Sequence, residues 1–352
     1  MSTLIIPCAG KSSRFPNMKP KWMLTHPDGE LMIEKALKGL NSEIFERIII
    51  TIVKPHDEKY EAGLILTQVF KNNPKVEICV LDNFTSSASE TVYLTLEKMN
   101  VKGSFVIKDS DNCVKVNIQE PVQNSITGYD LHKHPNISNI PGKSFLVVNK
   151  QNFVEDIIEK RVVSSVICLG VYAFEDVEEF KNAYKELKSK NISGEMYVSH
   201  IISYMLATKK SVFLVFEAED YEDWGTLKEW KDVQKRYRTY FVDIDGVLMK
   251  NCGKYGSRNW SNNREIISEN MATIKELQDN GAQIVITTSR PEEYRADLTA
   301  ILSENGIKPY AMLMGMNHAA RVVINDFAPT NPYPSGIAIS LPRNSFIKEY
   351  IA

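Results

Sequence analysis

The stretch that decides the fold is TLIIPCAGKSSRFPNMKPK, residues 3–21, in which a short apolar run passes directly into a basic loop. The run Thr3–Pro7 predicts a buried first strand. A glycine-containing turn after such a strand can bring backbone N–H groups up to phosphates, with a helix dipole behind them. Lys11, Arg14 and Lys21 place three cations on this turn, which suits a triphosphate. A basic surface loop is the alternative interpretation at this point.

Strand and helix patterns alternate through about the first 220 residues, which indicates an α/β fold with a largely parallel sheet covered on both faces. The expected strands are Thr3–Pro7, Arg47–Val53, Val76–Leu81, Ser104–Lys108, Ser144–Asn149, Ser164–Ala173 and Ser211–Glu217. The expected helices are Leu31–Leu40, His56–Phe70, Glu90–Met99, Val177–Ser189 and Tyr197–Ala207.

The charged stretch Thr226–Arg238 predicts a helical linker, after which the alternation of strands and helices restarts. At 352 residues the chain fits two domains better than one. We therefore expect a first domain over residues 1–228, a linker helix over 229–239 and a second domain over 240–352. In the second domain the expected strands are Tyr240–Asp243, Gln283–Thr287 and Arg321–Ile324, and the expected helices are Arg264–Asn280 and Glu292–Glu304.

The composition is that of an ordinary globular protein, with 43% hydrophobic residues, 24% charged residues and a net charge of -2. This balance favours neither a nucleic-acid partner nor a membrane-surface partner. We expect no signal peptide and no membrane-spanning segment. The five cysteines are scattered, without a C-x-x-C pair, which is typical of reduced thiols. The sequence therefore predicts a cytoplasmic protein. It leaves the oligomeric state open, with a homo-oligomer among the options.

Five segments of the first domain resemble, in order, the motifs of the sugar-phosphate nucleotidyltransferases. Gly10-x-Ser12-Ser13-Arg14 with the later Pro20-Lys21 resembles the G-x-G-T-R … P-K signature, with Ser12 in place of the second glycine. Ser86–Thr91 resembles the base-recognition loop, and Asp109–Asn112 the metal-binding aspartate segment. Glu159-Lys160, ahead of the strand with Gly170-x-Tyr172-x-Phe174, resembles the segment that holds the sugar phosphate, and Asp223–Thr226 the late D-x-G-T.

The resemblance implies a Rossmann-like domain with a mixed, mostly parallel sheet, in which a phosphorylated sugar or polyol attacks the α-phosphorus of a nucleoside triphosphate. Mg²⁺ held by Asp111 and Asp223 would neutralise charge on the transition state. Arg14 would contact the leaving pyrophosphate and Lys21 the attacking phosphate. The compact A-G-x-S-S-R-F form is similar to that of cytidylyltransferases, which favours CTP over UTP or dTTP. The implied nucleotide- and substrate-binding residues are Ala9, Gly10, Lys11, Ser12, Ser13, Ser87 and Ala88, with Glu159 on acceptor hydroxyls and Lys160 on the acceptor phosphate.

A second motif set begins where the strand Tyr240–Asp243 ends. Two aspartates at i and i+2, followed by a glycine, let one carboxylate attack phosphorus while the other handles protons. Asp243-x-Asp245-Gly246 resembles motif I of the haloacid dehalogenase (HAD) superfamily, which implies that Asp243 is the nucleophile and Asp245 the acid/base. Motif II implies Thr288, or the neighbouring Thr287, as the ligand of a phosphoryl oxygen. Motif IV implies that Asp326 completes a second Mg²⁺ site with Asp243 and Asp245.

The spacing of these motifs leaves no room for an inserted cap domain, so the second domain is expected to be a small, capless HAD-like Rossmannoid domain. The motif III lysine is not evident. Arg321 and Lys308 are candidates, although Arg321 would act only as a fixed charge. Asn325 stands where the superfamily often has a second acid.

The sequence therefore predicts a bifunctional enzyme that makes an activated sugar or polyol nucleotide and carries a tethered phosphatase acting on a related intermediate. By fold-level analogy, it would supply precursors of surface polysaccharide such as capsule. Two alternatives stay open. The HAD-like domain could be a non-catalytic binding or oligomerisation module, which the doubtful motif III favours, or the whole chain could be a non-enzymatic nucleotide sensor.

Overall fold

The computed structural model describes residues 2–134, 137, 139–190, 194–209, 211–253, 260, 265–326 and 336–351. The chain divides into two compact units, Met1–Trp230 (unit 1) and Lys231–Ala352 (unit 2), each with its own sheet. No helix among the described residues is both long enough and apolar enough to cross a membrane.

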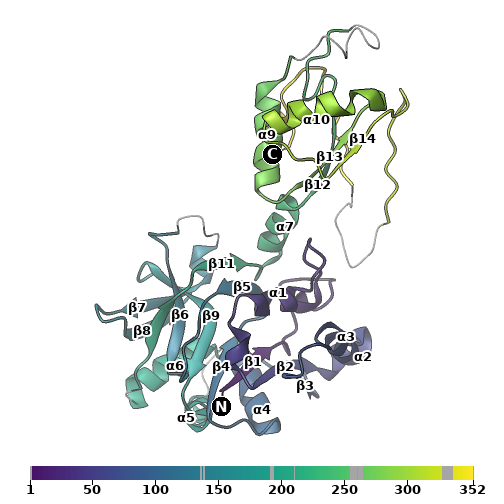
Figure 1. Cartoon of the computed structure of the whole chain (residues 1–352). Coiled ribbons are helices and arrows are strands. Elements are labelled where there is room, and N and C mark those ends of the chain that lie inside the picture. Colours follow the sequence, from purple (N-terminus) through teal and green to yellow (C-terminus); the bar gives the residue numbers. More distant parts are fainter. Residues whose placement is uncertain are drawn as a thin grey trace. The chain divides into compact units, whose positions relative to one another are not determined.

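A mixed sheet forms the middle of unit 1 (Figure 1). Its strands β3, β2, β1 and β4 run parallel, and β9 continues the sheet antiparallel to β4. The strand order is β10-β6-β9-β4-β1-β2-β3, with β7 pairing with β9 and β8 pairing with β7. The strands are β1 (Ser2–Pro7), β2 (Arg47–Val53), β3 (Val76–Leu81), β4 (Ser104–Lys108), β6 (Ser125–Asp130), β7 (Ser144–Val148), β8 (Val154–Glu159), β9 (Val166–Phe174) and β10 (Leu214–Glu217).

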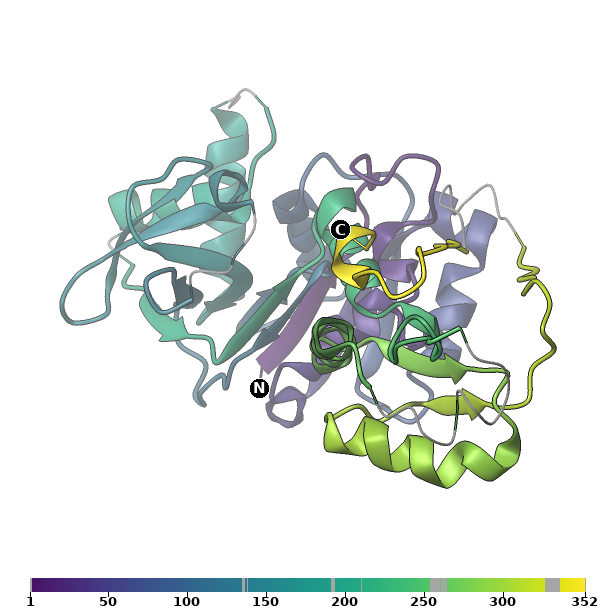
Figure 2. The same ribbon diagram turned by 90° about the horizontal axis from the view of Figure 1, so that it is seen from above.

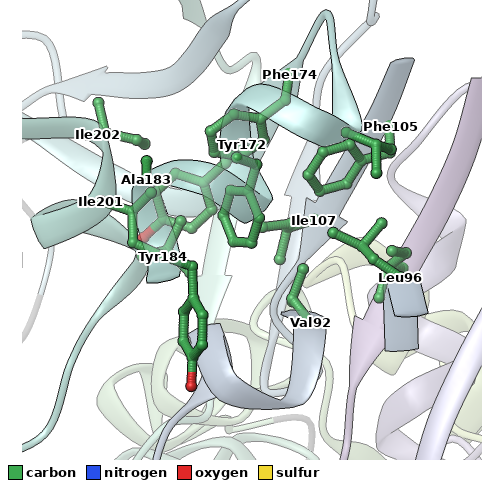
Figure 3. Packing of buried hydrophobic residues seen from close by; sticks show 14 of the residues in the cluster. Val92, Leu96, Phe105, Ile107, Tyr172, Phe174, Ala183, Tyr184, Ile201 and Ile202 are labelled. Carbon is green, nitrogen blue, oxygen red and sulfur yellow. The ribbon is translucent and has the colours of Figure 1, made fainter. Parts of the chain in front are cut away.

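Helices cover both faces of this sheet because its central strands are apolar on both sides. In β1, Leu4 and Ile6 pack into the core on one face and Ile5 packs into the core on the other. The Ile5 face is covered by α4 (Ala88–Lys98), α5 (Val177–Ser189) and α6 (Val198–Tyr204), and the other by α1 (Met32–Lys38) and α3 (Ala62–Val69). Figure 3 shows Val92, Leu96, Ala183, Tyr184, Ile201 and Ile202 of the first group around Phe105, Ile107, Tyr172 and Phe174.

Unit 1 has the predicted mixed α/β architecture with a mostly parallel central sheet, but several elements differ from the prediction. The predicted helix His56–Phe70 is two helices, α2 (Lys54–Tyr60) and α3, because Glu61 between them takes a left-handed φ of 53°. The predicted helix Tyr197–Ala207 is α6 followed by a π-helical turn, Met205–Lys209. The strands that the sequence does not predict include β6, β8 and a two-stranded antiparallel ribbon, β5 (Asn112–Lys115) with β11 (Asp220–Asp223).

The described residues of unit 2 hold a parallel three-stranded sheet in the order β12-β13-β14. The helices α9 and α10 share one apolar core with this sheet, and Figure 2 shows α10 running beside the strands. The helix α7 precedes β12, in the region where a linker helix is predicted. α7 (Leu227–Arg236) begins in unit 1 and ends in unit 2. The further elements of unit 2 are β12 (Thr239–Asp243), α9 (Ser268–Asp279), β13 (Gln283–Thr287), α10 (Arg295–Glu304) and β14 (Ala311–Leu313). The predicted start of α9 at Arg264 lies outside the described residues.

The predicted strand Arg321–Ile324 is wrong. These residues form no strand, and Val322, Val323 and Ile324 are 80%, 69% and 90% exposed. Among the described residues, the apolar run on which the prediction rests pairs with no strand, and an unpaired run of this length lacks the ladder hydrogen bonds that define a strand. The third strand of the sheet is β14, which the sequence does not predict.

Candidate active site

The loop after β1 folds back on itself at the carboxyl end of the central strands. Ser12 takes a left-handed φ of 50°, its carbonyl oxygen accepts from Phe15 N at 2.8 Å, and its hydroxyl accepts from Lys21 N at 3.2 Å. Lys21 begins a short 3₁₀ helix whose Trp22 is buried. Ser12 therefore adopts a backbone conformation that glycine would favour. Its hydrogen bond with Lys21 N holds Lys21 against the loop. The residues exposed around the turn are Gly10, Lys11, Ser13 and Arg14.

The segment Ser86–Thr91, which is predicted to recognise the base, leads into α4 next to this loop, because Thr85 N donates to the Ala9 carbonyl oxygen at 3.3 Å. Ser87 is the N-cap of α4, and its hydroxyl accepts from Glu90 N at 3.2 Å. Ser87 is buried and Ala88 is half-buried. The described contacts give Ser87 a structural role as a helix cap, and its contact with a base stays a prediction.

Asp111 and Asp223, which are far apart in the sequence, meet at Gly225. A Cβ placed on Gly225 would lie 3.1 Å from Oδ1 of Asp223, 3.2 Å from Oδ2 of Asp111 and 3.8 Å from Nη1 of Arg14. The β5–β11 ribbon brings the two aspartates together, because it pairs the segments that carry them. Next to the ribbon, Trp224 N donates to the Asp111 carbonyl oxygen at 2.9 Å. The structure therefore brings two predicted metal ligands and one predicted phosphate ligand to one point.

Two carboxylates that face one point fit a magnesium ion. Mg²⁺ is usually held by one or two carboxylates, with waters and substrate phosphates as its other ligands. Each carboxylate pairs with a lysine in the structure, Asp111 with Lys21 and Asp223 with Lys143. The described residues contain no group of three His, Cys, Asp or Glu side chains that could hold a metal ion. Substrate oxygens and water would therefore have to supply the remaining ligands.

The charges of this cluster shift its pKa values. Burial alone would raise the pKa of Asp111, but the charges of Lys21 and Arg14 outweigh it and lower the pKa to about 2. Burial, together with repulsion from Asp111, raises the pKa of Asp109 to about 6. Burial also lowers the pKa of Lys108 to about 8. Asp111 is therefore ionised at neutral pH, as a metal ligand must be.

Glu159 and Lys160, at the end of β8, are held against the start of α6. The Glu159 carboxylate accepts hydrogen bonds from the hydroxyls of Ser144 and Ser199, the latter at 2.8 Å. Lys160 takes a left-handed φ of 52°, and its Nζ lies 4.4 Å from the centroid of the Tyr197 ring and donates to the Tyr197 hydroxyl. Both charged side chains are therefore fixed in position by neighbours.

Sequence reasoning misses two charged side chains, Lys143, which pairs with Asp223, and Glu229, whose charge acts on Lys143. Lys143 pairs with Asp223 and donates to the Tyr221 hydroxyl at 2.8 Å, but it lies in a loop that carries no motif. Glu229 caps the start of α7, where its Oε2 accepts from Thr226 N at 2.8 Å. The pattern Thr226-x-x-Glu229 is that of a capping box, so the sequence carried a signal for Glu229 but none for Lys143.

The Asp109 side chain lies so close to residue 170 that only glycine fits there. The φ of Gly170 is +73°, and a Cβ there would lie 2.7 Å from Cγ of Asp109 and closer still to Oδ2. We expect Gly170→Ala to lower the free energy of unfolding by about 2–4 kcal/mol, from backbone strain and the displaced carboxylate together. Urea unfolding measures the loss. Gly29→Ala is the matched control, because its φ is +98° and a Cβ would meet nothing within 4 Å. Equal losses of unfolding free energy in the two variants would show that the Asp109 carboxylate is not what requires glycine at position 170.

In unit 2, Asp243 lies at the carboxyl end of β12, in register with Thr287 at the end of β13. Burial raises the pKa of Asp243. Nη2 of Arg321 lies 3.5 Å from Oδ1 of Asp243. The structure therefore places one candidate cation and one candidate hydroxyl residue beside the predicted nucleophile.

Asp245 and Thr288 are linked through a buried arginine that the sequence analysis does not identify. Arg290, 1% exposed, donates from Nε to Oδ2 of Asp245 at 3.0 Å and from Nη2 to Oδ1 at 2.7 Å. Arg290 N donates to the Thr288 hydroxyl at 3.1 Å. This bidentate pairing fixes the orientation of the Asp245 carboxylate.

The predicted metal site of Asp243, Asp245 and Asp326 is not assembled. All three aspartates are described, yet the described residues hold no cluster of three metal-ligating side chains, and Asp326 is exposed. Asp326 follows the predicted strand Arg321–Ile324, which was expected to carry it to the carboxyl end of the sheet and which the structure does not form.

Of the two candidates for the motif III cation, Lys308 lies at the wrong end of the sheet. It precedes β14, whereas Asp243 is the last residue of β12, and the two strands run in the same direction. A cation that sequence reasoning misses is Arg343, whose Cγ would lie 3.0 Å from a Cβ on Gly246.

The sequence matches no protein-family model. A search of curated proteins finds no match either. Solved structures do resemble the chain. A nucleoside-diphosphate-sugar pyrophosphorylase from Vibrio cholerae RC9 is 21% identical, with a TM-score of 0.55 over 65% of this chain and 98% of its own. The CTP:phosphocholine cytidylyltransferase from Streptococcus pneumoniae is 17% identical, with a TM-score of 0.52 over 66% and 98%. The inositol-1-phosphate CTP transferase from T. maritima is 13% identical, with a TM-score of 0.50 over 66% and 94%.

These likenesses show a fold, that of nucleotidyltransferases with a Rossmann-like sheet. The matched share of about two thirds equals that of unit 1, which holds 230 of 352 residues. The three structures are matched over nearly their whole length, so they offer no counterpart for an additional phosphatase domain.

Proposed function

We propose that unit 1 transfers a nucleotidyl group from a nucleoside triphosphate to a phosphorylated sugar or polyol and releases pyrophosphate. The observation that carries the proposal is the meeting of Asp111, Asp223 and Arg14 at Gly225, with Lys21 paired to Asp111. Two carboxylates and two cations around one point are what an in-line attack between phosphates needs. The fold of the similar structures supports the same reaction class.

In this mechanism, an oxygen of the acceptor phosphate attacks the α-phosphorus, and the bond from that phosphorus to the β-phosphate oxygen breaks. The attacking phosphate is already ionised, so the step needs no general base. Arg14 neutralises charge on the leaving pyrophosphate, and Lys21 orients the attacking phosphate. Asp111 and Asp223 would hold Mg²⁺, which as a Lewis acid would neutralise charge on the phosphates.

The acceptor is proposed to lie against Glu159 and Lys160, with its phosphate on Lys160 and its hydroxyls on Glu159. The Streptococcus pneumoniae structure is named for phosphocholine, and a quaternary ammonium is usually bound on an aromatic face. The Lys160 ammonium already occupies the face of the Tyr197 ring. This arrangement favours a sugar or polyol phosphate over phosphocholine.

CTP is the proposed nucleotide for two reasons. Residues 9–15 follow the A-G-x-S-S-R-F pattern, and two of the similar structures are named for CTP. The product would serve surface-polysaccharide synthesis in the cytoplasm, which is an argument from analogy only.

Unit 2 is proposed to be a capless, HAD-like phosphatase that acts on a related intermediate. Asp243 would attack phosphorus and form an aspartyl-phosphate. Asp245, the predicted acid/base, would have to be released from its bidentate pairing with Arg290 before it could protonate the leaving oxygen and then activate water. Arg321 and Thr288 would hold phosphoryl oxygens. A magnesium site with Asp326 does not fit the described geometry, so no step is assigned to a metal here. The same misfit favours the alternative, in which unit 2 is a non-catalytic module.

The test measures pyrophosphate and phosphate release in parallel, with Mg²⁺, across four nucleoside triphosphates and a panel of sugar, polyol and choline phosphates. We expect pyrophosphate with CTP and one sugar or polyol phosphate, and phosphate release from the same family of compounds. Pyrophosphate without phosphate would leave unit 2 as a binding module. Persistent failure to release pyrophosphate would overturn the proposed transfer and favour a nucleotide sensor.

A further inference from the structure

The side chain of Lys143 carries a largely buried positive charge in the middle of the unit 1 site. Its side chain is 12% exposed and pairs with Asp223, whose side chain is 11% exposed. Its Nζ also donates to the Tyr221 hydroxyl at 2.8 Å and lies 5.3 Å from the centroid of that ring. Lysines are rarely buried unless paired, so the contact with Asp223 is what holds the ammonium there.

The two lysines of the site together carry the charge of one divalent cation. Lys21 pairs with Asp111 and Lys143 pairs with Asp223, the same two carboxylates that face the point at Gly225. A metal ion bound at that point would take Oδ2 of Asp111, the oxygen that Lys21 occupies, and Oδ1 of Asp223, which belongs to the carboxylate whose Oδ2 pairs with Lys143. The ion would therefore neutralise the negative charge that holds each ammonium. Each lysine would then need a new anionic partner, because an unpaired ammonium in a largely buried position is costly.

The backbone shows where that partner would lie. Lys160 N donates to the Lys143 carbonyl oxygen at 3.1 Å, so Lys143 adjoins the segment that is proposed to hold the acceptor phosphate. Glu229, Asp111 and Asp109 are the other anions whose charges act on Lys143, and all three belong to the site itself.

We propose that Lys143 is a phosphate-binding residue for the acceptor, which Asp223 holds in place until a divalent cation takes Asp223. The proposal rests on the proposed nucleotidyl transfer. It makes metal binding and acceptor binding cooperative, because the metal ion releases the lysine that the acceptor phosphate then engages. The coupling is reciprocal, so the acceptor also strengthens metal binding.

The test replaces Lys143 by Met and measures two quantities. The first is Mn²⁺ binding to the free protein, followed from the electron paramagnetic resonance signal of unbound Mn²⁺. We expect at least about tenfold tighter binding, because the competing ammonium is gone. The second is the KM for the acceptor phosphate found in the panel, which we expect to rise about 10- to 100-fold, the range for one charge-assisted hydrogen bond.

Lys115→Met is the matched control. Lys115 lies on β5 of the same ribbon, and its Nζ pairs with Oε2 of Glu219 at 2.8 Å on the exposed surface. Both quantities should stay within about twofold of the wild type, since exposed ion pairs contribute little. Lys143→Gln removes the charge but keeps a hydrogen-bond donor for Tyr221, and it replaces the Met variant if that variant does not fold.

Unchanged Mn²⁺ affinity in the Lys143 variants would overturn the proposal, and so would an unchanged KM with tighter Mn²⁺ binding. Lack of turnover by the wild type would count against the proposed transfer alone, because Mn²⁺ binding is measured without turnover.

Discussion

Asp223→Asn is expected to lower kcat/KM for pyrophosphate release by at least about 10³-fold. The carboxylate is one of two that face the point at Gly225, and the amide that replaces it carries no charge for a cation there. Loss of about 4 kcal/mol of transition-state stabilisation corresponds to that factor, and a misplaced metal ion costs several kcal/mol. A coupled assay of pyrophosphate with the panel substrates measures the change.

Asp220→Asn is the matched control for this variant. Asp220 lies on the same strand, β11, but it is exposed and is not among the residues predicted to bind metal or substrate. The control should retain at least about half of the activity, since substitutions away from a site rarely matter. More than a tenth of the wild-type activity in Asp223→Asn would contradict a metal-binding role for Asp223.

The sequence predicted the centre of unit 1 well because its signals there are local. The strands Arg47–Val53, Val76–Leu81 and Ser104–Lys108 have the bounds that their apolar runs predict. A parallel strand buried on both faces reads as a continuous apolar run, and the loop that follows it lies at the carboxyl edge where ligands bind. The ends of β1 and β4 could therefore be named as site positions from the sequence.

The pairing that completes the site could not be predicted in the same way. The β5–β11 ribbon joins Asn112–Lys115 to Asp220–Asp223, two short polar segments without strand periodicity. Only the family resemblance suggested that Asp111 and Asp223 act together. Lys143 had no signal at all, because its role follows from long-range contacts and not from its neighbours in the chain.

In unit 2, by contrast, a strong local sequence pattern gave a wrong prediction. The β-branched run Arg321–Ile324 predicts a strand, yet its side chains are exposed and no strand in the described part of the chain pairs with it. Strand propensity reflects fit to a pleated, half-buried surface, so it predicts a strand only where a neighbour is present. The placement of Asp326 depended entirely on that strand.

Asp243→Asn is expected to lower phosphate release by at least about 10³-fold and to leave pyrophosphate release within about twofold of the wild type. An amide cannot form the aspartyl-phosphate, and the loss of a nucleophile removes the whole covalent route. Asp279→Asn is the matched control, because Asp279 lies on α9 in an exposed pair with Lys275.

The phosphate-release rates of these two variants also distinguish a phosphatase from a non-catalytic module, because the two functions predict different results. A phosphatase loses phosphate release on replacement of Asp243 and keeps it on replacement of Asp279. A non-catalytic module releases no phosphate beyond a trace contaminant, and both variants then match the wild type. Phosphate release that survives in Asp243→Asn at the wild-type rate would therefore remove Asp243 as the nucleophile, even though it lies beside Arg321 and Thr287 at the carboxyl end of the sheet.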